Sequence, residues 1–165
     1  MAASSSVYRI RPKVRGSRVG YMRESPAGEL TAPEGGELDR LLQRGYAISR
    51  EMFGAEVVDA RIRNATEFTR DLDTFITSYC FGDIWARDGL ARKTRSMLTM
   101  AMLIALGRQE ELKAHIRGGL ANGVTRDEIR EILLHAAAYC GIPAAVSSTR
   151  SAGEVLAEID GKEER

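Results

Sequence analysis

The chain has 165 residues, of which 44% are hydrophobic and 28% are charged, and this composition is typical of one folded globular domain. Its 24 basic and 23 acidic residues give a formal net charge of +1, so charge indicates neither a nucleic-acid partner nor a membrane partner. No apolar run is long enough to cross a bilayer and no apolar signal core is present, so we expect a cytoplasmic protein.

Two cysteines, Cys80 and Cys140, lie far apart in the sequence and form neither a CxxC pair nor a zinc pattern. We expect both to be reduced and packed as small apolar residues in the interior.

Residues 1–36 differ in composition from the rest of the chain. Serines are followed by basic residues and then by a stretch rich in proline and glycine. These residues are Ser4, Ser5, Ser6, Arg9, Arg11, Lys13, Arg15, Arg18, Pro26, Gly28, Pro33, Gly35 and Gly36. Apolar residues recur here with no stable period, which predicts a flexible basic arm or tag ahead of a helical domain at 37–160.

From Glu37 onward, apolar residues recur at three- and four-residue intervals, the spacing of helices. The first helix is expected to end at Gly54, and a short helix is expected from Val57 to Asn64. Thr69 or Asp71 is expected to cap the helix that follows.

The stretch from Leu90 to Leu106 is the most apolar of the chain, and its apolar residues cover every side of a helical wheel. A helix of this kind is usually buried on all sides, so we expect a central helix, which can also form a subunit interface. Gly107 is expected to end it.

Three more helices are expected after this one. The first runs from Gln109 to Ala121. Thr125 and Glu128 form a capping box that starts the second, which continues to about Cys140. Pro143 suits the first turn of the last helix. No segment alternates with period two for long enough to predict a strand, so the fold class is all-α.

The helix that starts at Gln109 carries an unusual face. Glu111 and His115 are one turn apart, and Gly118 and Gly119 fall in the same sector. Each glycine inside a helix costs about 1 kcal/mol relative to alanine, which indicates the close approach of another helix or a ligand. A carboxylate one turn from an imidazole can orient the ring, so His115 is a candidate proton carrier; the alternative is a partly exposed histidine with a neighbouring salt bridge.

Cations at one helix start form a second candidate group. Arg92, Lys93 and Arg95 begin the apolar helix, where positive charge opposes the macrodipole. They predict a compensating anion, which can be an acidic side chain, the substrate or a neighbouring subunit. The second histidine, His135, lies near acidic residues on its own helix and is expected to be structural.

Motifs for nucleophilic or cofactor chemistry are missing from the sequence. It contains no G-x-S-x-G, P-loop, GxGxxG after a strand, HExxH or cysteine–histidine cluster. No cofactor and no metal are therefore expected, and any chemistry must depend on proton transfer and charge stabilisation.

The segment YCFGDIWARDGLARKTRSMLTMAMLIALGRQEELKAHIRGGLANGVTRDEIREILLHAAAYCGIPAA and the R-E-M-F-G turn at Arg50 to Gly54 resemble the carboxymuconolactone decarboxylase family. The resemblance covers about Leu38 to Ile159. It implies an alkylhydroperoxidase-like helical bundle assembled as a homotrimer or homohexamer. It also implies cofactor-independent decarboxylation of a small anionic lactone, 4-carboxymuconolactone, to the β-ketoadipate enol-lactone of protocatechuate degradation.

Related peroxidases of this fold carry a CxxCxxxH signature, and the matching positions here are Arg108, Glu111 and His115. The histidine remains but both cysteines are missing, so dithiol peroxidase chemistry is not expected. A thiol peroxidase would instead require Cys80 and Cys140 to meet.

The implied substrate contains its own electron sink, because loss of CO2 leaves a dienolate spread onto the lactone carbonyl. The protein must hold the dianion, stabilise the oxyanion and deliver a proton to carbon. Our hypothesis is that His115, oriented by Glu111, delivers that proton. The expected substrate-binding residues are Arg95, Arg92, Trp85, Phe81, Tyr139 and Glu51.

Two other functions remain open at this point. One is a related lactone or keto-acid enzyme on the same fold, because a fold implies its substrate only weakly. The other is a non-catalytic helical oligomer that binds a small acid or a partner protein. The second predicts that side chains plug the Glu111–His115 face, and an open, polar-lipped pocket on that face would argue against it.

Overall fold

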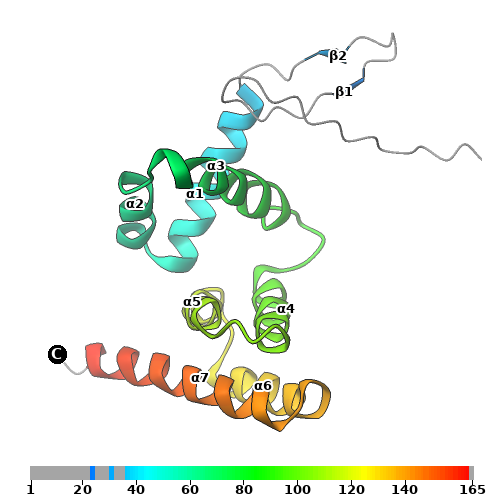
Figure 1. Ribbon diagram of the computed structural model, residues 1–165, viewed down its shortest axis with the longest axis vertical. Coiled ribbons are helices and arrows are strands. Elements are labelled where there is room, and N and C mark those ends of the chain that lie inside the picture. The colour runs from blue at the N-terminus through cyan, green and yellow to red at the C-terminus, as the bar shows by residue number, and fades with distance from the viewer. Residues whose placement is uncertain (1–22, 25–29, 32–35, 164–165) are drawn as a thin grey trace, which may run out of the picture. The chain divides into compact units, whose positions relative to one another are not determined.

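The computed structural model describes residues 23–24, 30–31 and 36–163, and each structural statement below concerns these residues. From residue 36 onward every regular element is a helix, as expected. The helices are α1 (Gly36–Phe53), α2 (Ala55–Arg63), α3 (Glu67–Phe75), the π-helix η1 (Ile76–Ile84), α4 (Arg92–Ala105), α5 (Gln109–Ala121), α6 (Arg126–Cys140) and α7 (Ile142–Glu163) (Figure 1). Most of the expected N-terminal arm lies outside the described residues. Within it, β1 (Arg23–Glu24) pairs antiparallel with β2 (Leu30–Thr31).

Two local predictions need correction. The helix after α2 is capped by Thr66, not by Thr69 or Asp71, and Thr69 instead completes the capping box from the third helical position. The apolar run of that region continues in a π-helix, η1, which follows α3 without a break. The capping box of Thr125 and Glu128 is confirmed at the start of α6.

Helices α1 and η1 pack backbone against backbone, and two glycines make this possible. A Cβ atom at Gly45 would lie 2.0 Å from the carbonyl oxygen of Thr77, and one at Gly82 would lie 2.1 Å from that of Leu41. The side chain of Arg44 spans the same contact, because its Nε donates to the Gly82 carbonyl oxygen at 2.7 Å. The position of η1 on α1 is therefore fixed by main-chain atoms.

Helix α5 connects the two halves of the packed helices, because it contacts α1 on one side and α4 and α7 on the other. Its Leu112 and Ile116 are fully buried, in a cluster with residues of α4, α6 and α7. Gly118 and Gly119 are explained by the same packing. Phe53 and Met52 lie over Gly118, and Met100 lies over Gly119, so neighbouring helices rather than a ligand approach the backbone.

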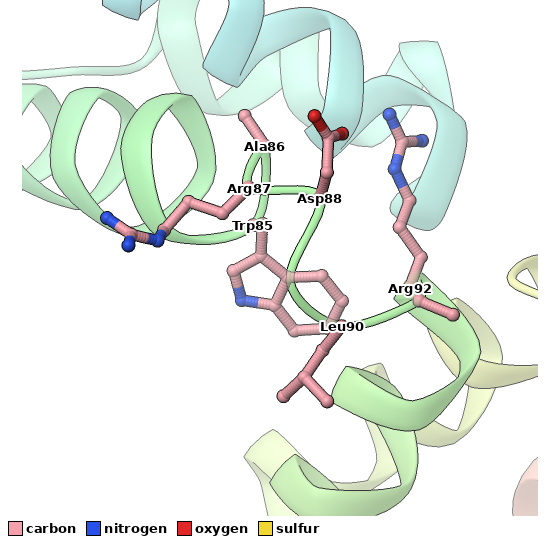
Figure 2. Close-up of a pocket in the computed structure, with 7 residues that line it drawn as sticks. Trp85, Ala86, Arg87, Asp88, Leu90 and Arg92 are labelled. Carbon is pink, nitrogen blue, oxygen red and sulfur yellow. The ribbon is translucent and has the colours of Figure 1, made fainter.

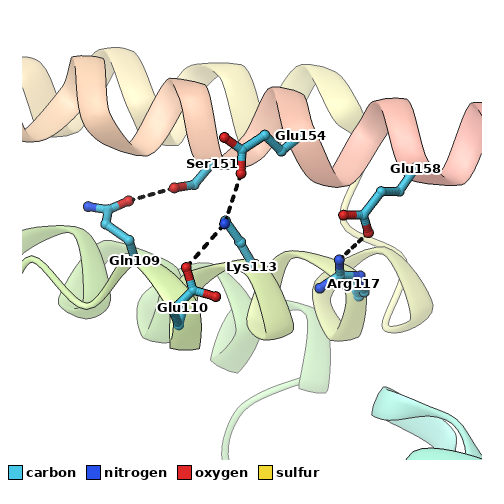
Figure 3. Close-up of polar contacts among 7 residues, drawn as sticks. All are labelled: Gln109, Glu110, Lys113, Arg117, Ser151, Glu154 and Glu158. Atoms are coloured by element: carbon cyan, nitrogen blue, oxygen red, sulfur yellow. Dashed lines mark hydrogen bonds and ion pairs between the residues drawn. The ribbon is translucent and has the colours of Figure 1, made fainter.

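Polar contacts join α5 to α7 along their length (Figure 3). Gln109 accepts a hydrogen bond from Ser151 at 2.9 Å, Lys113 pairs with Glu154 at 2.8 Å, and Arg117 pairs with Glu158. Partner numbers rise together on both helices, so α5 and α7 run in the same direction. Lys113 and Arg117 therefore help to align the helices.

Helix α4 is not buried on all sides in the single chain. Ser96, Met100 and Ile104 are buried, whereas Leu98, Met102 and Leu106 are exposed. The opposite side of this apolar helix thus has no cover among the described residues.

Across all residues that the structure describes, no helix has the length and hydropathy needed to span a membrane.

Replacing Gly45 with alanine should lower the free energy of unfolding by about 3 kcal/mol, because the new methyl group meets main-chain atoms that cannot move independently. Urea denaturation followed by circular dichroism measures this. The matched control is Gly153→Ala, where a Cβ atom would have nothing within 4 Å and should stabilise α7 slightly. Equal stability of the two variants would show that the α1–η1 contact adapts.

Candidate functional site

The imidazole of His115, on α5, packs against aromatic rings from two other places in the chain. It meets Phe53 edge-on, with ring centroids 5.5 Å apart and planes at 90°. It stacks on Trp85 at 6.3 Å and 28°. Phe81 touches both of these neighbours, at 5.7 Å from Phe53 and 6.0 Å from Trp85. We call Phe53, Phe81, Trp85 and His115 the aromatic cluster.

Local backbone structure sets the positions of these rings. Phe53 is the last residue of α1, and Gly54 follows with φ = 90°, a conformation that L side chains rarely adopt. Trp85 ends η1, where its N–H donates at 2.8 Å to the carbonyl oxygen of Cys80, five residues earlier. This π-type bond rotates Trp85 relative to an α-helical path, and π-helical turns are frequent at functional sites.

Burial sets the protonation state of His115. Its Nδ1 atom is buried and has no hydrogen-bond partner among the described residues. Removal from water disfavours the charged ring and lowers the pKa of His115 below its usual value. In the ligand-free protein the ring is therefore neutral at pH 7.

Glu111 is exposed, and no hydrogen bond joins it to His115 in the described part of the chain. The hypothesis that Glu111 orients His115 thus has no contact in support. Packing against Phe53 and Trp85 fixes the ring plane instead.

A cavity of about 260 Å³ lies where η1 leads into α4 (Figure 2). It is lined by Trp85, Ala86, Arg87, Asp88, Leu90, Ala91 and Arg92. Trp85 belongs both to the wall of this cavity and to the aromatic cluster. Trp85 therefore connects the cavity wall with the imidazole of His115.

The three cations predicted at the start of α4 each contact a different partner. Arg92 forms an ion pair with Glu51, another predicted site residue, and Lys93 pairs with Glu128 at 2.8 Å. Arg95 donates from Nη2 to the carbonyl oxygen of Arg87 at 3.0 Å, which ties the loop lining the cavity to α4. Its Nε atom is buried without a hydrogen-bond partner in the described chain.

Acidic side chains thus supply the expected compensating charge for Arg92 and Lys93. Ala91 precedes the first residue of α4 and gives the helix no side-chain cap, and the first turn contains no acidic residue. The cavity lies at this end of α4, where the backbone N–H groups and the helix dipole are electropositive.

Tyr139 lies away from the other predicted wall residues. It is exposed on α6, in a groove of about 530 Å³ between α4 and α6, where its ring lies 4.6 Å from that of His135. The groove is lined by Met97, Ala101, Glu128, Glu131, Ile132, His135, Ala136, Tyr139 and Cys140. Phe81 and Trp85 lie near His115, as expected, but Tyr139 belongs to this groove.

Both cysteines are free. Cys80 is half-buried and burial raises the pKa of its thiol, whereas Cys140 is exposed, so the prediction of two interior cysteines is wrong for Cys140. Nowhere in the described chain do three His, Cys, Asp or Glu side chains gather closely enough to hold a metal ion.

Phe53, Asp88 and Leu90 were not among the predicted site residues. Phe53 was within reach, because it stands in the R-E-M-F-G turn that was singled out for Glu51. Asp88 and Leu90 carry no sequence signal, since they line the cavity only through the path of the loop between η1 and α4.

Comparison with known proteins places this arrangement in a family. The model of the carboxymuconolactone decarboxylase family matches residues 70–154. A 4-carboxymuconolactone decarboxylase of Acinetobacter baylyi is 38% identical over 117 residues, which cover 71% of this chain and 87% of the relative. A nitrosuccinic acid decarboxylase of Metarhizium robertsii is 44% identical over 109 residues, which cover 66% of this chain and 76% of the relative. The chain is therefore a member of the carboxymuconolactone decarboxylase family and a carboxy-lyase.

Proposed function

We propose that this protein removes CO2 from a small di-acid without a cofactor, with 4-carboxymuconolactone as the first candidate substrate and nitrosuccinic acid as the second. The observation that supports this best is the cavity lined by Arg92 and Trp85, whose indole also stacks on the half-buried imidazole of His115. It combines a cation for an acid, an apolar wall and a proton carrier. The relatives' names supply the two candidates.

Both candidate substrates carry their own electron sink. When the bond to the departing carboxylate breaks, the electron pair moves into a conjugated lactone carbonyl in one case and into a nitro group in the other. One proton then adds to carbon, so the net reaction consumes a proton and releases CO2. Nothing in this sequence of steps needs an external electron acceptor.

We assign the proton transfer to His115, the titratable group of the aromatic cluster, which packs on Trp85 of the cavity wall. The aromatic cluster keeps water from Nδ1, and the ring is neutral before substrate binds. A bound dianion brings negative charge close to the imidazole, which raises its pKa and favours proton uptake. The substrate itself would thus convert His115 into the acid that quenches the carbanion.

The relatives, which are named decarboxylases, argue against a non-catalytic binding protein. The rings of Phe53 and Trp85 cover His115, and the cavity that Asp88 and Arg92 line lies at the loop before α4 and not on the Glu111–His115 face. The second candidate substrate is favoured by the higher identity to the nitrosuccinic acid decarboxylase, 44% against 38%.

Replacing His115 with glutamine should lower kcat by about 10²-fold or more, which is the usual contribution of a positioned proton donor. The assay follows loss of fresh 4-carboxymuconolactone or nitrosuccinate and release of CO2, with the uncatalysed rate subtracted. The control is His135→Gln, which changes the other histidine. Near-normal turnover by a folded His115→Gln variant would rule out this role.

The lowered pKa of His115 also predicts a pH dependence of stability. As pH falls below about 6.5, the unfolded chain binds a proton at this position before the native chain does, so the free energy of unfolding decreases. This loss continues until pH reaches the native pKa. Urea denaturation at pH 7.5 and pH 5.5 should show a larger loss for the wild type than for His115→Gln. Equal losses would mean that the ring is not buried as described.

We also propose that the protein is a homo-oligomer, a trimer or hexamer, in which the groove between α4 and α6 faces a second copy. Exposed apolar residues flank the groove on both helices, including Leu98 and Met102 on α4 and Leu134 and Tyr139 on α6. An unpartnered apolar surface of this kind usually marks a protein interface.

Replacing Ala101 with glutamate should dissociate the oligomer, because Ala101 is exposed and lines the groove, and a charge there would be buried on association. Size-exclusion chromatography with light scattering measures the mass. Glutamate is a good helix former, so α4 should stay folded. The control is Val57→Glu, an exposed apolar residue on α2. An unchanged mass for Ala101→Glu would exclude this groove as the interface.

A further inference from the structure

The cavity beside Trp85 has two chemically different ends (Figure 2). The indole of Trp85 and the side chain of Leu90 supply apolar surface at one end. The guanidinium of Arg92 lies at the other end and points the same way as the carboxylate of Asp88, while the side chain of Arg87 turns away. A di-acid that binds here meets an apolar surface and, apart from it, a guanidinium with a carboxylate nearby.

Decarboxylation decides which carboxylate belongs at which end. The departing carboxylate loses its negative charge as CO2 forms, so a strong cation beside it would stabilise the ground state more than the transition state. An apolar, poorly hydrated wall has the opposite effect on that group. The cation is therefore useful only for a carboxylate that the product keeps.

The two candidate substrates share one unit that fits this division. In both 4-carboxymuconolactone and nitrosuccinate, the carbon that loses CO2 also carries a carboxymethyl group, CH2COO⁻. Their electron acceptors differ in shape and chemistry, so the acceptor is not the common element. The element that the two substrates share is the retained carboxymethyl group.

Building on the proposed function, we infer that the site accepts acids with a succinate unit, in which an electron acceptor is conjugated to the carbon losing CO2, and that Arg92 binds the retained carboxymethyl group. The C–CO2⁻ bond breaks against the Trp85 end, its electron pair moves into the acceptor, and a proton adds to carbon. CO2 leaves and the carboxymethyl group stays on Arg92. Arg92 is then a specificity-determining residue.

Arg92 can take up such a ligand without leaving its present partner. The ion pair with Glu51 uses one terminal nitrogen, Nη1, of a guanidinium that carries five N–H donors. Both side chains of the pair are substantially exposed, at 39% and 61%, and such pairs hold each other weakly. A carboxylate arriving from the cavity can share or displace Glu51. The volume of about 260 Å³ suits a small acid of this kind.

The test compares nitrosuccinate with 2-nitrobutanoate, in which a methyl group replaces the retained carboxylate. The wild type should prefer nitrosuccinate in kcat/KM by about 10- to 100-fold, the value of a charge-assisted hydrogen bond. In Arg92→Gln this preference should vanish through a higher KM for nitrosuccinate, with 2-nitrobutanoate unchanged. Arg92→Lys, which keeps the positive charge, should recover part of the preference for nitrosuccinate. Arg126→Gln breaks an ion pair of similar exposure between α6 and α7, away from the cavity, and should behave as the wild type.

Succinate gives a second readout that needs no turnover. Trp85 is the only tryptophan of the chain and lines the cavity, so its fluorescence should change as succinate binds. This change should be lost in Arg92→Gln and kept in Arg126→Gln. Equal turnover of both nitro acids by the wild type, or an equal loss for both in Arg92→Gln, would overturn the assignment of Arg92 alone. No decarboxylation of any candidate di-acid would overturn the proposed function and this inference together.

Discussion

The main-chain contact between α1 and η1 is the constraint on which the site depends. Because Gly45 and Gly82 carry no side chains, the two helices meet at carbonyl oxygens, with Arg44 bonded across them. This fixes η1 on α1 and brings Phe81 against Phe53. The π-helical geometry of η1 then turns Trp85 toward α5, so that a stacked imidazole is held without a hydrogen bond at Nδ1.

Helix α5, which carries His115, is held in place by separate contacts. Leu112 and Ile116 anchor it in the core with α4, α6 and α7, and the polar contacts of Lys113 and Arg117 with α7 limit its sliding. His115 lies on the remaining face, toward α1. Rigid elements thus hold both the imidazole and its aromatic walls, which is the preorganisation that a proton transfer in a dry site requires.

Much of the fold could be predicted from local sequence signals. Gly107, Asn122 and the pair Thr125 and Glu128 give helix ends within a residue or two, because capping chemistry is local. The π-helix and the surface of α4 could not be predicted in this way. Apolar spacing does not separate α- from π-helical hydrogen bonding, and an apolar helix looks the same whether its cover is intramolecular or a second copy. Of the predicted site residues, Trp85 and Phe81 lie near His115, whereas Glu111 and Tyr139 lie elsewhere, because their placement depends on how helices distant in sequence pack.

The claim at the centre of this mechanism is that a residue of the folded site, and not bulk water, protonates the carbanion. The reaction in D2O tests it directly, because one deuterium then enters the product at a carbon that also keeps one hydrogen. Early quenching and NMR of a chiral derivative give the stereochemistry at that carbon. The aromatic cluster and His115 predict a single stereoisomer from the wild type and a mixture from His115→Gln. An equal mixture from the wild type would mean that the carbanion leaves the site unprotonated.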